Sequence, residues 1–423
     1  MKYGIHFFLI CCAFILVSCS PISEGYTDKV SYQAGDSLIL FASSWKSFDE
    51  VAIELKDING NTRHTYTTAI KSQSISNEMP YTKGFGYSPT LKIKVPDLES
   101  GVYTFADDIP FVVKPSEPFD ILVLYSSNTE NAYGDSGGKS LYDYNSSDDK
   151  AATIVSFQRP IELPKHSTEF LKWIATQNQY KIGYVCDRDL DDYETISNAK
   201  LLIITGHSEY WTRKARLNFD RFVDQGKNAL ILSGNTMWWQ VRYSDDGNQM
   251  ICYKSFENDP IADVRLKTVN WPDSVLAYSP MNSIGVDFNH GGYGKKSDEG
   301  WDGFKITNPD APFFKGMDIK KNDVLWVKTH EYDGAQLNFA ENADKVTLQN
   351  SFNFHRYELI GYDLASRMPG SNAAWVLLQK KPESGLIINT ASTDWCAETG
   401  MTGKDSEKIK AVTLNMVDYL LTH

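Results

Sequence analysis

Side chains that could take part in chemistry are concentrated in four short segments of the sequence. Residues 128–142, 206–211, 234–242 and 392–396 combine tyrosine, tryptophan, carboxylate, amide, hydroxyl and lysine or histidine side chains. Binding and catalytic sites bring a few such polar groups together with apolar or aromatic walls. Each segment follows a short apolar run typical of a buried strand, so we expect the four segments to line one site.

Two familiar catalytic motifs are matched only in part. Residues 138–140 (Gly-Lys-Ser) resemble the end of a phosphate-binding loop, but Tyr133 stands where the first glycine is required. Residues 206–210 resemble a nucleophile elbow around Ser208, but Tyr210 occupies a position that needs a small residue. The sequence therefore gives no support to a phosphate-binding loop and weak support to a serine nucleophile.

The elements that must position these segments alternate between strand and helix after residue 118. Short apolar runs predict strands at 120–125, 181–186, 201–205, 228–233 and 385–390. Apolar residues at helical spacing predict helices at 168–177, from about 212 to 226, and at 405–421. This alternation predicts an α/β fold with a doubly wound, mostly parallel sheet, in which ligands bind beyond the carboxyl ends of the strands.

The chain before residue 117 has a different character. Runs at 37–41, 50–55, 91–95 and 102–105 read as short strands separated by turn residues. We therefore expect an accessory β-sandwich of the immunoglobulin-like kind at 19–116, and an α/β domain at 117–423. A turn-rich stretch at about 240–381 is expected to be an inserted excursion from that domain.

The first residues resemble a bacterial lipoprotein signal. An apolar run after Lys2 is short for a membrane span and ends in Leu16-Val17-Ser18-Cys19. We expect a signal peptide at 1–18, with Cys19 as the lipid-modified first residue of the mature chain. Ser20 favours the outer membrane of a Gram-negative cell. The protein is thus expected to be exported and attached to the membrane through this lipid only.

Composition excludes several other classes of protein. The 423 residues carry a formal net charge of −12 and a sequence pI near 5.2, which argues against a nucleic-acid partner. Beyond Cys19, three widely spaced cysteines remain, namely Cys186, Cys252 and Cys396. They can form at most one disulfide within the chain, and buried free thiols are the default interpretation.

Several short motifs, taken in order, resemble the C-terminal domain of the large (beta) subunit of N,N-dimethylformamidase. They lie at 132–133, 137–142, 156–160, 206–211, 234–242 and 252–254, and the resemblance covers about 119–423. That family is similar in fold to class I glutamine amidotransferases but works without a cysteine nucleophile. The resemblance implies a mononuclear iron (Fe³⁺) held by Tyr133, Tyr142 and Glu209, and no other cofactor.

The resemblance also implies roles for neighbouring residues. His207, Asn235 and Lys254 would occupy the catalytic substrate and acid/base positions. Tyr210, Trp211, Asp394 and Trp395 are interpreted as walls of the site. Simpler roles stay open from the residues alone: the two tyrosines could be packed aromatics, and Glu209 could favour the start of the helix near 212.

Two functions therefore remain open. The first is an iron-dependent amidohydrolase that acts on a linear amide, hydrolysing the C–N bond of a small substrate, with a small partner subunit possible. Hard anionic oxygen ligands suit ferric iron, which would act as a Lewis acid on the amide carbonyl. The alternative is a non-catalytic surface lipoprotein that binds carbohydrate or another ligand and has a degenerate metal site.

Overall fold

The computed structural model describes residues 21–294, 300–339, 346–366 and 370–423. The expected signal peptide and the lipidated Cys19 lie outside these residues. Within the described residues, no helix combines the length and apolar character needed to cross a membrane. The cysteines Cys186, Cys252 and Cys396 are buried free thiols.

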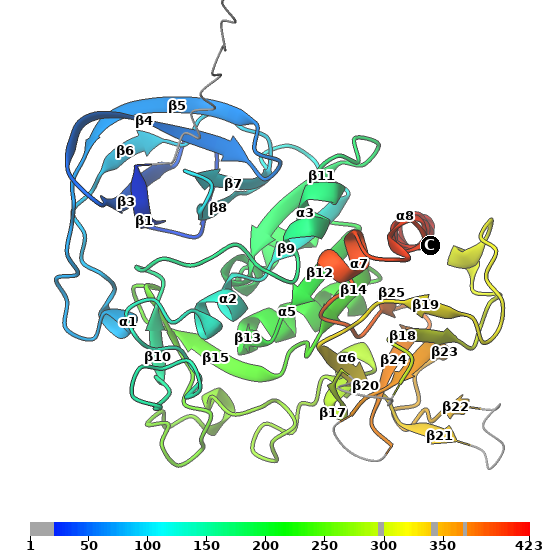
Figure 1. Cartoon of the computed structure of the whole chain (residues 1–423). Coiled ribbons are helices and arrows are strands. Elements are labelled where there is room, and N and C mark those ends of the chain that lie inside the picture. The colour runs from blue at the N-terminus through cyan, green and yellow to red at the C-terminus, as the bar shows by residue number, and fades with distance from the viewer. Residues whose placement is uncertain (1–20, 295–299, 340–345, 367–369) are drawn as a thin grey trace, which may run out of the picture.

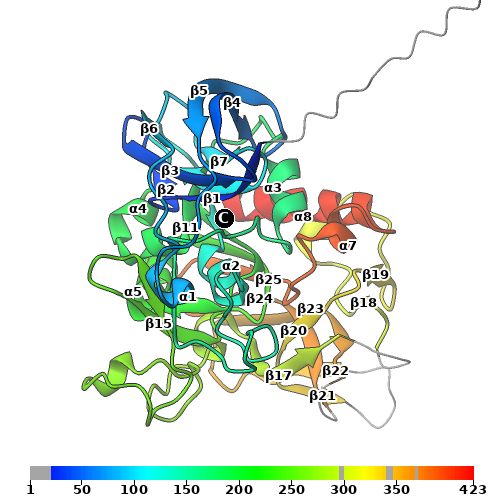
Figure 2. The same cartoon turned by 60° about the vertical axis from the view of Figure 1, so that its left-hand side comes forward.

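The N-terminal part consists of two packed β-sheets (blue to cyan in Figure 1). The first sheet has the order β1 (Ile22–Thr27), β3 (Ser37–Ser44), β6 (Leu91–Lys94). The second has the order β2 (Ser31–Tyr32), β8 (Ile109–Val113), β7 (Gly101–Phe105), β4 (Phe48–Asp57), β5 (Thr62–Ile70). Inward residues of both sheets, among them Leu40, Leu55 and Phe111, form one apolar core. Figure 2 shows this unit stacked on the larger, C-terminal part.

A nine-stranded sheet forms the centre of the C-terminal part. Its order is β11 (Ile182–Cys186), β9 (Ile121–Tyr125), β12 (Leu201–His207), β14 (Asn228–Gly234), β25 (Leu386–Asn389), β24 (Asn372–Gln379), β23 (Arg356–Leu364), β18 (Gly303–Ile306), β19 (Val324–Trp326). The first five strands run parallel to their neighbours, and the remaining four add by antiparallel pairing.

Helices cover both faces of the parallel strands. On one face, α3 (Thr168–Ile174) and α8 (Ser406–Thr422) pack against alternate residues such as Val123 and Ile203. On the other face, α4 (Tyr193–Ser197) and α5 (Arg213–Asp224) pack against Leu124 and Ile204. Because both faces are buried, these strands have continuous apolar sequences rather than alternating ones.

The expectation of a doubly wound, mostly parallel α/β fold is wrong. The chain is rich in β structure: its described residues form strands β1–β25 but only helices α1–α8. In the nine-stranded sheet, four of the eight strand pairings are antiparallel. The physical reason is that β18, β19, β23 and β24 come from the turn-rich stretch at 240–381, which extends the sheet instead of leaving it.

Smaller sheets complete the surroundings of the four candidate segments. One has the order β10 (Ile154–Ser156), β16 (Gln249–Ile251), β15 (Trp239–Tyr243), β13 (Tyr210–Thr212), and others pair β17 (Asp287–Tyr293) with β20 (Glu331–Gly334) and β21 (Leu337–Phe339) with β22 (Val346–Leu348). The remaining helices are α1 (Pro80–Lys83), α2 (Ser127–Tyr133), α6 (Met281–Ile284) and α7 (Glu398–Met401). The four-stranded sheet and β20 extend from the region where the parallel strands end, which brings distant segments together there.

Candidate metal centre and surrounding site

Three oxygen-bearing side chains meet in a tight cluster. The Tyr133 hydroxyl donates to Glu209 Oε2 at 2.9 Å, and the Tyr142 hydroxyl lies 2.9 Å from that of Tyr133. Tyr142 also lies 3.0 and 3.1 Å from the two Glu209 carboxylate oxygens. A fourth residue, Tyr210, donates its hydroxyl to Tyr142 at 2.7 Å. The structure thus places all three sequence-predicted metal ligands side by side.

Local structure explains why these residues meet. Helix α2 begins directly after β9 and ends at Tyr133, while Glu209 lies in the short connection between β12 and β13. The loop that carries Tyr142 is held in place because Asn145 donates to the Tyr133 carbonyl at 2.7 Å and Ser146 donates to the Tyr142 carbonyl at 2.6 Å. Since β9 and β12 are parallel neighbours, the segments that follow them lie at one edge of the sheet.

Burial controls the protonation of this cluster. Desolvation, reinforced by the negative charge of Glu209, raises the pKa of the Tyr133 and Tyr142 phenols well above their ordinary value. For Glu209, burial favours the neutral acid, but the ion pair with His207 outweighs burial and lowers the pKa. The protein alone therefore holds two neutral phenols around one ionised carboxylate.

His207 lies between two carboxylates. Its Nε2 is 3.4 Å from Glu209 Oε2 and 3.6 Å from Glu331 Oε2. Burial opposes its protonation, but the ion pair with Glu209 and the charges of Glu331 and Glu130 raise its pKa to about 9. A buried imidazolium flanked by carboxylates can donate a proton at neutral pH.

Asn235 positions a carboxylate that the sequence did not reveal. Its amide nitrogen donates to Glu331 Oε2 at 2.9 Å, and Asn235 directly follows β14 with a φ of 49°. Asparagine tolerates this left-handed conformation better than most residues. Burial raises the pKa of Glu331, so this carboxyl is suited to exchanging protons. Glu331 begins the short strand β20, whose sequence Glu-Tyr-Asp-Gly carries no recognisable motif.

Lys254 supports the tyrosines rather than contacting Glu209. Its Nζ donates to the Leu141 carbonyl at 3.0 Å and lies 3.4 Å from the centre of the Tyr142 ring. Burial lowers its pKa. A cation in this position stabilises negative charge on the adjacent Tyr142 ring.

The four residues interpreted as walls have different surroundings. Tyr210 contacts the oxygen cluster through its hydroxyl. Asp394 lies close by, in contact with His330 and His166, two residues that the sequence analysis did not select. Trp211 and Trp395 lie instead in the apolar cores on the two faces of the sheet. Their indole nitrogens donate to Ser208 and Thr413, so both tryptophans are core residues here.

The Tyr-Tyr-Glu cluster fits a hard metal ion. In an octahedral site with metal–oxygen bonds of about 2.1 Å, neighbouring ligand oxygens are about 3.0 Å apart. The oxygens of Tyr133, Tyr142 and Glu209 are separated by 2.9 to 3.1 Å, as three ligands on one face of an octahedron would be. Phenolate and carboxylate are hard oxygen donors, and three protein ligands leave positions open for water and substrate.

Comparison with known proteins identifies the family. The sequence profile described as "N,N-dimethylformamidase beta subunit-like, C-terminal" matches residues 59–405. The chain belongs to this family. The match begins within the N-terminal sandwich, earlier than the position near 119 expected from the motifs. Membership in the N,N-dimethylformamidase-like family is consistent with a hydrolase.

Two other comparisons add little. No curated protein matches the chain. Among solved structures, a protein described as ThuA-like from Bacteroides uniformis is 10% identical, covers 72% of this chain and 91% of its own length, and has a TM-score of 0.34. A likeness at this level carries no information about function.

Proposed function

We propose that this protein hydrolyses the C–N bond of a small linear amide at a mononuclear iron held by Tyr133, Tyr142 and Glu209. The observation that carries the proposal is the mutual spacing of the three ligand oxygens, 2.9 to 3.1 Å, in a buried cluster. Family membership supports the same reaction class. Bound ferric iron would supply Lewis-acid chemistry, polarising the amide carbonyl and acidifying water.

Two residues beside this cluster carry out the two proton transfers that amide hydrolysis requires. Glu331, whose pKa is raised by burial and whose Oε2 is held by Asn235, accepts a proton from the attacking water. His207, whose Nε2 lies 3.4 Å from Glu209 Oε2 and 3.6 Å from Glu331 Oε2, donates a proton from Nε2 to the departing amine. A general acid and a general base therefore lie 3.6 Å apart, close enough to serve the same substrate.

Two further residues act on the tyrosines. Lys254 places its ammonium over the Tyr142 ring and favours the phenolate form of that side chain. Tyr210 donates its hydroxyl to the Tyr142 oxygen and fixes the direction of its remaining lone pairs. Both contacts orient a ligand without touching substrate.

We further propose that the enzyme works outside the cytoplasm, anchored through a lipid on Cys19. The support is the order of charge, apolar run and small residues before Cys19 in the sequence. Metabolic labelling with a radioactive or alkyne-bearing fatty acid should mark the parent chain and leave a Cys19→Ala variant unlabelled. A small partner subunit is compatible with this proposal, and the mass of the purified native complex would reveal one.

The test of the reaction begins with colour and metal content. The chain from residue 20 onward should purify with about one iron and show the visible charge-transfer band of ferric tyrosinate. Tyr133→Phe and Glu209→Gln should lose both iron and colour. The matched control is Tyr144→Phe, because this exposed tyrosine contacts the Tyr142 ring but has no hydrogen bond to Glu209 among the described residues.

Activity is then measured as amine release from small amides and N-substituted formamides. Glu331→Gln and His207→Asn should retain the iron colour and lose turnover. The proposal would be refuted if the parent protein purified without iron and had the same visible spectrum and the same rate of amine release as the Tyr133→Phe variant. Binding of sugars without any amide hydrolysis would favour a non-catalytic surface lipoprotein instead.

A further inference from the structure

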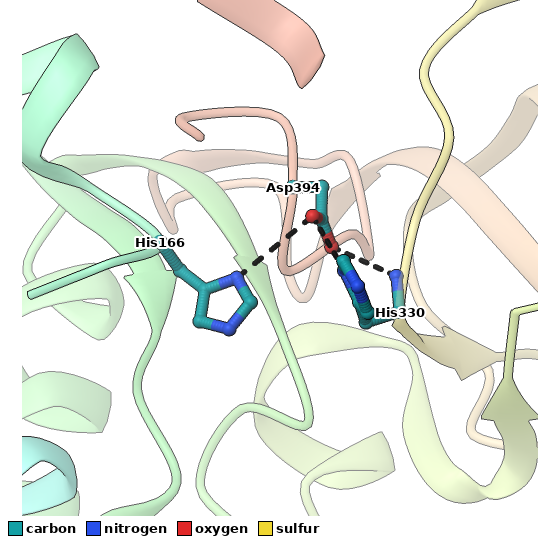
Figure 3. Close-up of side chains that lie close together, drawn as sticks. All are labelled: His166, His330 and Asp394. Carbon is teal, nitrogen blue, oxygen red and sulfur yellow. Dashed lines mark hydrogen bonds and ion pairs between the residues drawn. The ribbon is translucent and has the colours of Figure 1, made fainter. Parts of the chain in front are cut away.

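A second group of possible metal ligands lies beside the Tyr-Tyr-Glu cluster and shares no residue with it. His166 precedes α3, His330 precedes β20, and Asp394 follows β25. One ligand atom from each can be chosen so that all three lie within 4.8 Å of one another. Figure 3 shows both imidazole rings directed at the Asp394 carboxylate. The three side chains come from segments more than sixty residues apart in the sequence, so their meeting is a property of the fold.

The Asp394 carboxylate is oriented for a bond in one direction. Its Oδ2 accepts from the His330 backbone N–H at 2.8 Å and from the Thr393 hydroxyl at 2.6 Å. Its Oδ1 faces His330 Nδ1 at 2.8 Å and His166 Nδ1 at 3.9 Å. Fixing one oxygen by neighbouring donors is how proteins orient a carboxylate ligand toward a metal.

The surroundings of His166 also favour a bound cation. Its Nδ1 is buried and, among the described residues, has no hydrogen-bond partner, although its nearest carboxylate oxygen is Asp394 Oδ1 at 3.9 Å. Buried polar nitrogens without a partner are rare because desolvation is costly. A cation between the imidazole and the carboxylate would satisfy this atom.

The spacing is close to that of a tetrahedral zinc site. With bonds of about 2.0–2.1 Å, neighbouring ligands of a tetrahedral Zn²⁺ are about 3.3 Å apart. The two distances from Asp394 Oδ1, 2.8 and 3.9 Å, lie on either side of this value, and the three ligand atoms lie within 4.8 Å of one another. His330 has a side chain that is 66% exposed, which gives the ion a path from solvent.

We propose that His166, His330 and Asp394 bind a second, zinc-type divalent cation next to the iron-binding cluster. Two imidazoles and one carboxylate are ligands typical of Zn²⁺, and they leave a fourth position open for water or an oxygen of a ligand. The cation keeps a net positive charge with these ligands, so the open position favours anionic or carbonyl oxygens. The site does not depend on the presence of iron or on amide hydrolysis.

The test uses Co²⁺ as a spectroscopic substitute for Zn²⁺. The chelator-treated chain from residue 20 onward is titrated with Co²⁺ and followed by its visible d–d absorption, then by competition with Zn²⁺. One equivalent of Co²⁺ should bind in the Glu209→Gln variant, which lacks the iron-binding carboxylate. Zn²⁺ should displace it. Absence of d–d bands in this variant would overturn the proposal.

Variants of the three ligands complete the test. His166→Asn and His330→Asn should each weaken Co²⁺ binding by more than about a hundredfold, beyond the roughly 10–100-fold loss typical of a residue that only orients a ligand. His330 is exposed, so its replacement leaves folding intact even if His166→Asn does not fold. The control is His290→Asn, because His290 forms the same kind of pair with Asp287, at 2.7 Å, but belongs to no group of three possible metal ligands among the described residues. Equal Co²⁺ affinity in parent and His330→Asn would show that the trio is a hydrogen-bonded arrangement without metal.

Discussion

Replacing Arg159 should loosen the segment that joins the two tyrosines of the Tyr-Tyr-Glu cluster, from the end of α2 at Tyr133 to the loop that carries Tyr142. This arginine is fully buried. Its guanidinium donates to the backbone carbonyls of Asn131, Ser136, Lys139 and Ser156 at 2.7 to 3.2 Å. The carbonyls of Asn131, Ser136 and Lys139 lie along the chain from α2 to the loop before Tyr142, and that of Ser156 lies at the end of β10. One side chain therefore fixes the path of the backbone between the two tyrosines.

The net contribution of Arg159 follows from two opposing effects. Hydrogen bonds to a charged group contribute about 1.5 kcal/mol each at the low end, or about 6 kcal/mol for four carbonyls. Burial lowers the pKa of the guanidinium from 12.5 to about 10. At about 1.4 kcal/mol per pKa unit, that burial costs about 3 kcal/mol. We therefore expect Arg159→Met to destabilise the folded protein by about 3 kcal/mol.

The assay is differential scanning calorimetry combined with the visible spectrum of the iron-loaded protein. For a large domain, about 3 kcal/mol corresponds to a decrease in melting temperature of roughly 6 °C. The control is Arg265→Met, which removes an exposed arginine paired with Asp263 and should change little. If Arg159→Met melts like this control and keeps the ferric tyrosinate colour, the argument that Arg159 positions the tyrosines is refuted.

Three further perturbations test the charges in this part of the molecule. Asp259→Asn breaks a buried bidentate pair with Arg242, at 2.8 and 2.9 Å, and should cost about 3 kcal/mol in calorimetry. Burial opposes ionisation of Asp259, but Arg242 lowers its pKa below the ordinary 3.8, so the stabilisation is present above pH 3.8 and is lost on further acidification. The difference between parent and variant should accordingly be constant from about pH 5 to 8 and shrink below about pH 4. Lys254→Met should weaken iron binding about tenfold in a spectroscopic titration, whereas Lys254→Arg should retain affinity. Iron present at about a hundred times its dissociation constant should stabilise the parent by about 2–3 kcal/mol, so its removal by a chelator should lower the melting temperature. The melting temperature of Glu209→Gln should not change.

Individual strands and helices of the C-terminal part could be predicted from the sequence because their signals are local. The run at 201–205 is continuous in apolar residues and corresponds to β12 (Leu201–His207). The helix expected at 405–421 corresponds to α8 (Ser406–Thr422). In both cases the pattern of apolar residues within a short segment is sufficient to predict the type of element.

The composition of the sheet could not be predicted in the same way. Strand β24 (Asn372–Gln379) is as apolar as the parallel strands, but β18 and β19 have only four and three residues and are separated from it by long turn-rich segments. Their places in the sheet depend on antiparallel pairings between segments far apart in the chain. No local pattern encodes such pairings, and the stretch at 240–381 consequently looked like an excursion.

The same distinction applies to the candidate site. Tyr133, Glu209 and Asn235 follow predicted parallel strands, whose carboxyl ends must lie at one edge of a sheet. Glu331 and His330 enter from β20, which pairs with β17 outside the nine-stranded sheet. A four-residue strand with three polar or glycine positions has no periodicity that would distinguish it from a loop.

The charge balance of the cluster sets a condition on the iron that we propose to bind there. Two buried phenols and the Glu209 carboxylate lie within 3.1 Å of one another, and Glu331 adds a second carboxylate close to His207. His207 offsets one of the two carboxylates, and the charge of Lys254 also lowers the pKa of Glu209, although the Lys254 ammonium donates its hydrogen bond to the Leu141 carbonyl. Without a metal, the phenol protons must remain to limit repulsion. A metal that binds here must release them, because only a phenolate is a strong ligand. Binding of the proposed ferric iron would therefore displace both phenol protons, and a trivalent cation would offset two phenolates and a carboxylate more fully than a divalent one.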